Sequence, residues 1–190
     1  RFAMSGKTAM PTSQNPDGIV QIVGFQVVFT GIMYGVMKAG LEAKIPCSHE
    51  WNWQQSLAMF VGMAGIVGGW MGANTNRARK EHGVPWPRTF APESHKNKDA
   101  FDAVQRAHLN FTENIAVYIG YAFAAAQIAP KLASIFGIFL LLGRVVFARG
   151  YYSGIAKNKD AGVFGYILGV FPLAGLTWCF LFQSLGWLQW

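Results

Sequence analysis

The sequence predicts an all-α integral membrane protein, with a bundle of four membrane-spanning helices and an extra N-terminal transmembrane helix. Three observations lead to this fold class. Only 13% of the 190 residues are charged and 52% are hydrophobic, whereas ordinary soluble domains are about 25% charged. The charged residues avoid three long runs, residues 51–76, 114–130 and 161–190, which are long enough to enter or cross a bilayer as helices. The basic residues, which give a net charge of +7, gather between the apolar segments.

Five apolar segments are the expected helices. The first, Ile19–Met37, has no charged residue and would span roughly 28 Å as a helix. Only Pro130 and Lys131 separate the third segment from the fourth, so these two are predicted to form an antiparallel hairpin. We expect an N-terminal extension, residues 1–55, followed by a four-helix domain, residues 56–190. The other four segments cover residues 56–73, 101–130, 132–148 and 161–187.

The distribution of basic residues predicts the topology. If the segments cross in alternation, eleven of the sixteen Lys and Arg fall on one side, in the N-terminal stretch and in residues 74–103 and 149–160. The positive-inside rule places that side in the cytoplasm or the mitochondrial matrix, so an endoplasmic reticulum membrane and a mitochondrial membrane both remain open. Nucleic-acid binding is excluded, because it needs basic residues on one continuous polar face.

Neither a disulfide nor a metal site is expected. Cys47 lies in a connection and Cys179 in an apolar run, and the Cys47-Ser48-His49 stretch is too sparse to hold a metal. Glycines four residues apart have the spacing that allows helices to approach closely in lipid, although glycine is frequent in membrane helices in general. These pairs are Gly65 and Gly69, Gly68 and Gly72, and Gly165 and Gly169.

A polar stripe enters the membrane in the first half of the third segment. On a helical wheel, Asp102, Arg106, Asn110 and Glu113 fall within about 60° of one another. Glu113 would lie roughly 18 Å along the helix, too deep for its side chain to reach water. The hairpin should bring Arg144 to a comparable depth. Intramembrane charges suggest a functional site, and the alternative is a structural ion-pair network of Arg106, Glu113 and Arg144.

The number of hydrogen-bond donors favours a ligand over a purely structural network. Several donor side chains are expected to converge near one leaflet, where they would form a pocket for a small polyanion. They are Arg79, Arg106, Asn110, Arg144, Tyr151 and Tyr152.

Two runs carry a resemblance to a known family. Residues 105–110 (QRAHLN) followed by Glu113, and residues 143–154 (GRVVFARGYYSG), are similar to the signature regions of the MAPEG family, the membrane-associated proteins of eicosanoid and glutathione metabolism. The third type of microsomal glutathione transferase is the most similar branch. Further matches at residues 77–87, at Gly162 and Gly165, and at residues 185–187 extend the resemblance over about residues 56–188.

The resemblance implies a homotrimer of four-helix protomers that binds glutathione, as a cosubstrate, between neighbouring subunits. The implied activity is that of a glutathione transferase or peroxidase acting on lipophilic electrophiles or lipid hydroperoxides. Arginines suit the two carboxylates of glutathione and Glu113 suits its ammonium group, while nearby cations favour the nucleophilic thiolate. The implied glutathione-binding residues are Arg79, Arg106, Asn110, Glu113 and Tyr151, with Arg144 as a signature arginine.

Three departures from the family pattern affect catalysis. Phe147 stands where relatives have tyrosine, Asn114 replaces an aromatic residue of the leukotriene-forming branch, and the arginine that this branch has near Asn158 is missing. Lys157 and Lys159 are the remaining candidates for a catalytic cation, with a solvated basic turn as their alternative role.

Two further interpretations stay open beside the enzyme. The first is a catalytically degenerate accessory subunit of a larger organellar complex, such as a mitochondrial respiratory complex, docked through Ile19–Met37. The second is an adaptor that binds lipids without reacting. His108 is expected to pack between helices, because it lies about 160° away from Arg106 on the wheel.

Overall fold

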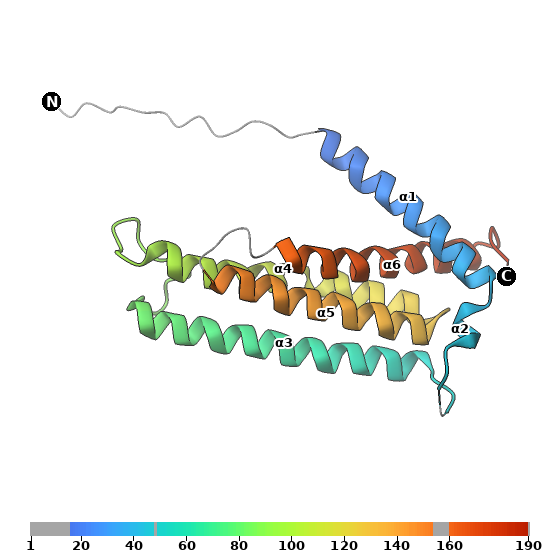
Figure 1. Cartoon of the computed structure of the whole chain (residues 1–190), viewed down its shortest axis with the longest axis horizontal. Helices are drawn as coiled ribbons and strands as arrows, with labels where there is room; N and C mark the ends of the chain where they lie inside the picture. Colours follow the sequence, from blue (N-terminus) through green and yellow to red (C-terminus); the bar gives the residue numbers. More distant parts are fainter. Residues whose placement is uncertain (1–15, 48, 154–159, 190) are drawn as a thin grey trace.

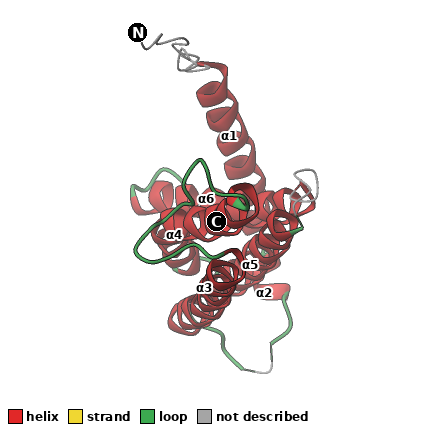
Figure 2. Cartoon of the chain, turned by 90° about the vertical axis from the view of Figure 1, so that its left-hand side faces the viewer, coloured by secondary structure: helices red, strands yellow, loops and turns green. Residues whose placement is uncertain are grey.

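The computed structural model describes residues 16–47, 49–153 and 160–189, and within these ranges every regular element is a helix. Four long helices lie side by side, and a fifth leans obliquely against α6 on the outside of the bundle (Figures 1 and 2). The predicted all-α fold class is confirmed. The helices are α1 (Pro16–Lys38), α2 (Leu41–Lys44), α3 (Trp53–His82), α4 (Lys98–Ala126), α5 (Pro130–Tyr152) and α6 (Asp160–Ser184).

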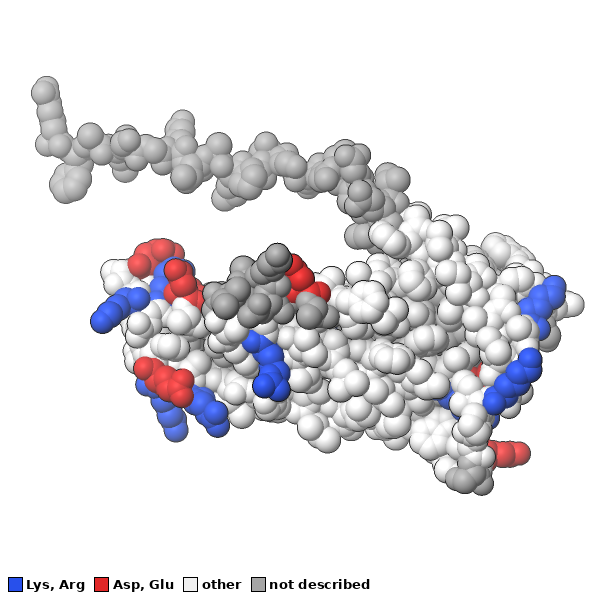
Figure 3. Space-filling model, in the orientation of Figure 1, with Lys and Arg blue, Asp and Glu red and all other residues white. Residues whose placement is uncertain are grey.

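The surface of the bundle fits a bilayer. Of the described helices, α3, α5 and the Gly162–Ser184 part of α6 are long and apolar enough to cross a membrane, and Val23–Lys38 of α1 is a shorter apolar helix. α4 is of similar length, but it is more polar in its first half. Figure 3 shows charged side chains at the two ends of the visible face and few between them. The protein is therefore a multi-pass membrane protein.

α3 is longer at its C-terminal end than the apolar pattern predicts. It begins at a capping box in which Asn52 and Gln55 exchange side-chain to backbone hydrogen bonds. It runs past Ala73 to His82 and ends at Gly83, whose φ of 69° closes the helix. The additional turns carry basic residues that interact favourably with the C-terminal end of the helix dipole. An apolar run marks only the part of a helix that lies inside lipid. The helical segment α3 continues beyond its apolar run, so the prediction was too short.

The predicted hairpin between α4 and α5 is present, but its predicted boundary is wrong. Pro130 and Lys131 are the first residues of α5, and residues 127–129 form the connection. Proline suits the first helical position, because that residue needs no hydrogen-bond donor. The Glu42 carboxylate, from α2, accepts hydrogen bonds from the Lys131 and Leu132 backbone N–H groups at 2.8 and 3.0 Å. The N-terminal extension therefore caps α5.

α1 packs along α6. At Gly175, an added Cβ would lie 2.9 Å from the Phe29 carbonyl oxygen, so only glycine allows this close approach. The rings of Phe29 and Phe171 stack with centroids 5.4 Å apart. Cys179 donates from Sγ to the Thr30 carbonyl oxygen at 3.6 Å. Both Cys47 and Cys179 are free, as expected.

The predicted close approach of helices at glycines is confirmed at the contact between α5 and α6. It is not found along the whole of α3. A Cβ on Gly143 would lie 2.4 Å from the Tyr166 backbone nitrogen, and one on Gly169 would lie 2.4 Å from the Leu140 backbone nitrogen. Around Gly65 and Gly69, by contrast, a Cβ would meet no atom within 4 Å. The pair Gly165 and Gly169 therefore serves helix packing, whereas Gly65 and Gly69 do not serve it within one chain.

Candidate functional site

Arg144 is a cation buried inside the helix bundle. Only 5% of its surface is exposed. Its Nη2 donates to the Asn110 backbone carbonyl at 3.2 Å and to the Asn110 side-chain oxygen. Three aromatic rings surround the guanidinium, with centroids 5.0–5.4 Å from Cζ, a distance at which cation–π attraction stabilises a positive charge. These rings belong to Tyr118, Phe147 and Tyr166.

A cavity of about 280 Å³ adjoins this guanidinium, between α4, α5 and α6. Among the residues that the structure describes, no acidic side chain lines it. Among the described residues, ion pairs join only Lys98 to Glu93 and Asp102, so the ion-pair network considered for Arg106, Glu113 and Arg144 does not form there. A buried cation without a counter-charge favours an anionic ligand. The cavity is lined by Asn110, Asn114, Tyr118, Arg144, Phe147, Val163 and Tyr166.

The predicted polar stripe of α4 has members with different roles. Asp102 accepts hydrogen bonds from the Ala91 backbone N–H at 2.9 Å and from Lys98 Nζ at 2.7 Å, and the hydrogen bond to Asp102 raises the pKa of Lys98. Asn110 faces Arg144, whereas Arg106 and Glu113 are exposed on the outer surface. The structure therefore brings Asn110 and Arg144 together and leaves Arg106 and Glu113 outside the cavity.

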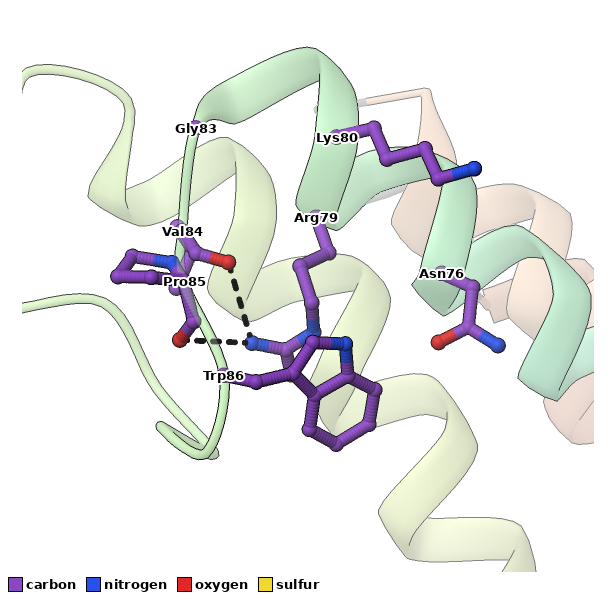
Figure 4. A pocket seen from close by; sticks show the side chains of 7 residues that line it. All are labelled: Asn76, Arg79, Lys80, Gly83, Val84, Pro85 and Trp86. Carbon is purple, nitrogen blue, oxygen red and sulfur yellow. Dashed lines mark hydrogen bonds between the residues drawn. The ribbon is translucent and has the colours of Figure 1, made fainter.

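Arg79 is also buried, with 6% of its surface exposed, and it organises the loop after α3. Its Nη1 donates to the carbonyl oxygens of Val84, Pro85 and Arg88 at 3.3, 3.4 and 2.8 Å. The guanidinium lies 4.2 Å from the Trp86 ring centroid, and Figure 4 shows the indole stacked against it. These contacts engage one nitrogen, while Arg79 Nε has no hydrogen-bond partner among the described residues.

A second cavity, of about 240 Å³, lies between α3, α4 and the loop that Arg79 holds. Two further buried polar atoms there, Thr75 Oγ1 and Gln105 Oε1, have no hydrogen-bond partner in the described part of the chain. His108 lines this cavity and faces Gly72 of α3, so its predicted position away from Arg106 is confirmed. The complete lining is Gly72, Thr75, Asn76, Arg79, Trp86, Pro87, Arg88, Thr89, Gln105 and His108.

The remaining predicted residues lie elsewhere. Tyr151 and Tyr152 line a separate cavity of about 400 Å³ at the basic end of the bundle, beside Arg77 and His82. The predicted convergence of donors in one pocket is therefore not found within a single chain. Lys157, Asn158 and Lys159 fall outside the described residues.

The sequence analysis missed two groups of residues. Tyr118 and Tyr166 lie in apolar runs and resemble ordinary membrane aromatics, so only the fold shows that they meet at Arg144. Thr75 and Gln105 stand beside other polar residues, namely Asn74, Asn76 and Arg106, so the sequence pattern does not single them out.

Comparison with known proteins agrees with this architecture. The model of the MAPEG family matches residues 57–182, a range that includes α4, α5 and both buried arginines and leaves α1 and α2 outside. An uncharacterized protein of Synechocystis sp. is 31% identical over 111 residues, which cover 58% of this chain and 77% of that protein. Because the family model matches well over half of this chain, the chain belongs to the MAPEG family.

Proposed function

We propose that this protein binds glutathione and directs its thiolate at a lipophilic electrophile or a lipid hydroperoxide. The observation that carries the proposal is Arg144, a buried cation that faces a cavity whose described lining contains no acidic residue. Glutathione brings the missing negative charge, and members of the MAPEG family use it. A thiol beside a fixed cation loses its proton more readily, and the thiolate is the reactive nucleophile.

The peptide part of glutathione fits the outer face of α4. Arg106 and Glu113 lie within about one helical turn on either side of Asn110, and both are exposed. The Arg106 guanidinium is suited to a carboxylate and the Glu113 carboxylate to the ammonium group. The cysteine side chain then enters the ring-lined cavity at Arg144. Proximity inside this cavity supplies part of the rate acceleration.

A homotrimer accounts for the second cavity. The cavities at Arg144 and at Arg79 share no lining residue, and in the proposed trimer one ligand contacts the Arg144 cavity of one copy and the Arg79 cavity of its neighbour. The exposed side chains of Arg106 and Glu113 also need to be shielded from lipid, because a charged side chain inside the membrane is energetically costly. A neighbouring copy provides that cover, and its Arg79 cavity contributes further polar groups to the same ligand.

The test is glutathione binding to detergent-purified protein, measured by isothermal titration calorimetry. Arg144→Met removes the buried charge and keeps much of the side-chain volume, so binding should weaken at least about tenfold. Arg149→Met, an exposed arginine at the end of the same helix, is the matched control and should bind as the wild type does. Unchanged binding by a correctly assembled Arg144→Met variant would refute the proposed site.

One observation favours the accessory-subunit alternative. α1 lies outside the family match, and apart from its contact with α6 it presents a broad apolar surface. Extraction in mild detergent separates the two functions, because three copies of this chain alone support the enzyme and one copy among unlike subunits supports the accessory role. The exposed residues are Val23, Phe25, Val27, Val28 and Ile32.

A further inference from the structure

The hydroxyl group of Tyr118 is buried and lacks a well-formed hydrogen bond. The residue is 1% exposed, and its hydroxyl oxygen has no partner at good hydrogen-bond geometry among the described residues, although the Tyr166 side chain lies close enough to interact with it. Buried tyrosine hydroxyls are normally hydrogen-bonded, because an unsatisfied polar group lowers stability. Tyr118 lines the cavity at Arg144. A donor group that the protein leaves unsatisfied at a cavity is available to a ligand.

The neighbours of Tyr118 show what that ligand atom should be. The Arg144 guanidinium lies 5.4 Å from the Tyr118 ring centroid, so a ligand atom that binds the hydroxyl group also lies near a positive charge. The Tyr166 ring lies 6.1 Å away in an edge-on arrangement, and Phe147 offers no hydroxyl at all. Nδ2 of Asn114 already donates to the Asn110 carbonyl oxygen. A hydrogen-bond donor beside a cation, among aromatic rings, suits a large and weakly hydrated anion.

We propose that the Tyr118 hydroxyl donates a hydrogen bond to the thiolate sulfur of bound glutathione and, together with Arg144, activates the thiol. This inference rests on the proposed function. On activation the S–H bond breaks, the proton passes to water, and the sulfur keeps the electron pair. Arg144 supplies the positive charge and Tyr118 the directed donor.

Tyr118→Phe tests this assignment, because it removes only the hydroxyl. The ultraviolet absorbance of the glutathione thiolate, followed against pH in the purified protein, gives the thiol pKa. We expect that pKa to rise by about one unit in Tyr118→Phe, which lowers the thiolate fraction at neutral pH by up to about tenfold. Total glutathione affinity at a pH below the thiol pKa should stay within about twofold of the wild type. The Tm without ligand should stay equal or rise, since an unsatisfied hydroxyl is lost.

Tyr152→Phe is the matched control. It also removes one buried hydroxyl group that has no hydrogen-bond partner among the described residues, but Tyr152 lines the separate cavity at the basic end of the bundle. A thiol pKa shift in Tyr152→Phe and not in Tyr118→Phe would overturn the assignment. A fall in the Tm of Tyr118→Phe would also overturn it, because the hydroxyl would then stabilise the protein itself.

The two proposals fail in distinguishable ways. If the wild type binds no glutathione, the proposed function fails and this inference fails with it. If the wild type binds glutathione and forms the thiolate, but Tyr118→Phe keeps the same thiol pKa, the inference alone fails.

Discussion

Arg144 donates from one nitrogen to both the backbone and the side-chain oxygen of Asn110. This contact joins the cation of α5 to the middle of α4. Asn110 accepts hydrogen bonds but brings no negative charge, so the guanidinium keeps its full positive charge. The pair therefore orients a cation toward the cavity without neutralising it, which is the arrangement an anion-binding site needs.

Asn110→Asp should raise the stability of the protein and weaken its glutathione binding. A carboxylate at this position would form an ion pair with Arg144 inside the bundle and give the buried cation a counter-charge. We expect a higher Tm and a glutathione affinity at least about tenfold weaker, from thermal unfolding and calorimetry. Gln54→Glu adds the same charge at an exposed position in the first turn of α3 and should leave the glutathione affinity near the wild-type value. Asn110→Asp with unchanged glutathione affinity would show that the charge of Arg144 is not used in binding.

Gly143→Ala should weaken the contact between α5 and α6. Its Cβ would lie 2.4 Å from the Tyr166 backbone nitrogen, and backbone atoms in a packed helix pair cannot move aside cheaply. Overpacking of this kind costs about 1–3 kcal/mol or more, which should appear as a lower Tm. Gly69→Ala is the control, because its Cβ would meet nothing within 4 Å and alanine favours helix. Equal stability of the two variants would mean that the α5–α6 contact is looser than described.

Sequence patterns predicted the long helices well and the site only in part. Apolar runs free of charge mark the residues inside lipid, so α1, α5 and α6 were found within a few residues of their ends. α3 was placed too short, because its last turns are polar.

Side-chain partners were harder to predict, since helical periodicity gives direction but not the neighbouring element. The helical wheel places Asn110 and Glu113 on one face, within about 60° of each other. An angular difference of this size around the helix axis decides whether a side chain contacts α5 or faces outward. Asn110 therefore contacts Arg144, while Glu113 is exposed.

Glu42→Ala should loosen the attachment of the N-terminal extension. The carboxylate caps two backbone N–H groups at the start of α5, and loss of such a cap costs about 0.5–2 kcal/mol. We expect a lower Tm by thermal unfolding, with partial recovery in Glu42→Gln, which keeps one acceptor oxygen. Glu50→Ala removes an exposed carboxylate from the connection between α2 and α3 and should leave the Tm unchanged. A neutral Glu42→Ala would mean that solvent or lipid headgroups replace the cap.

Arg79→Lys should separate a structural role of this arginine from a role in ligand binding. Arg79 holds three carbonyl oxygens of residues 84–88 with one nitrogen and stacks on Trp86. Lysine keeps the charge but lacks the planar fork and the stacking surface. Without glutathione, chymotryptic cleavage after the exposed Phe90 should become several-fold faster in Arg79→Lys, as followed by mass spectrometry. Lys80→Arg, at the exposed neighbouring position, should be cleaved at the wild-type rate. Unchanged cleavage of Arg79→Lys, together with weaker glutathione binding, would assign Arg79 to the ligand and not to the loop.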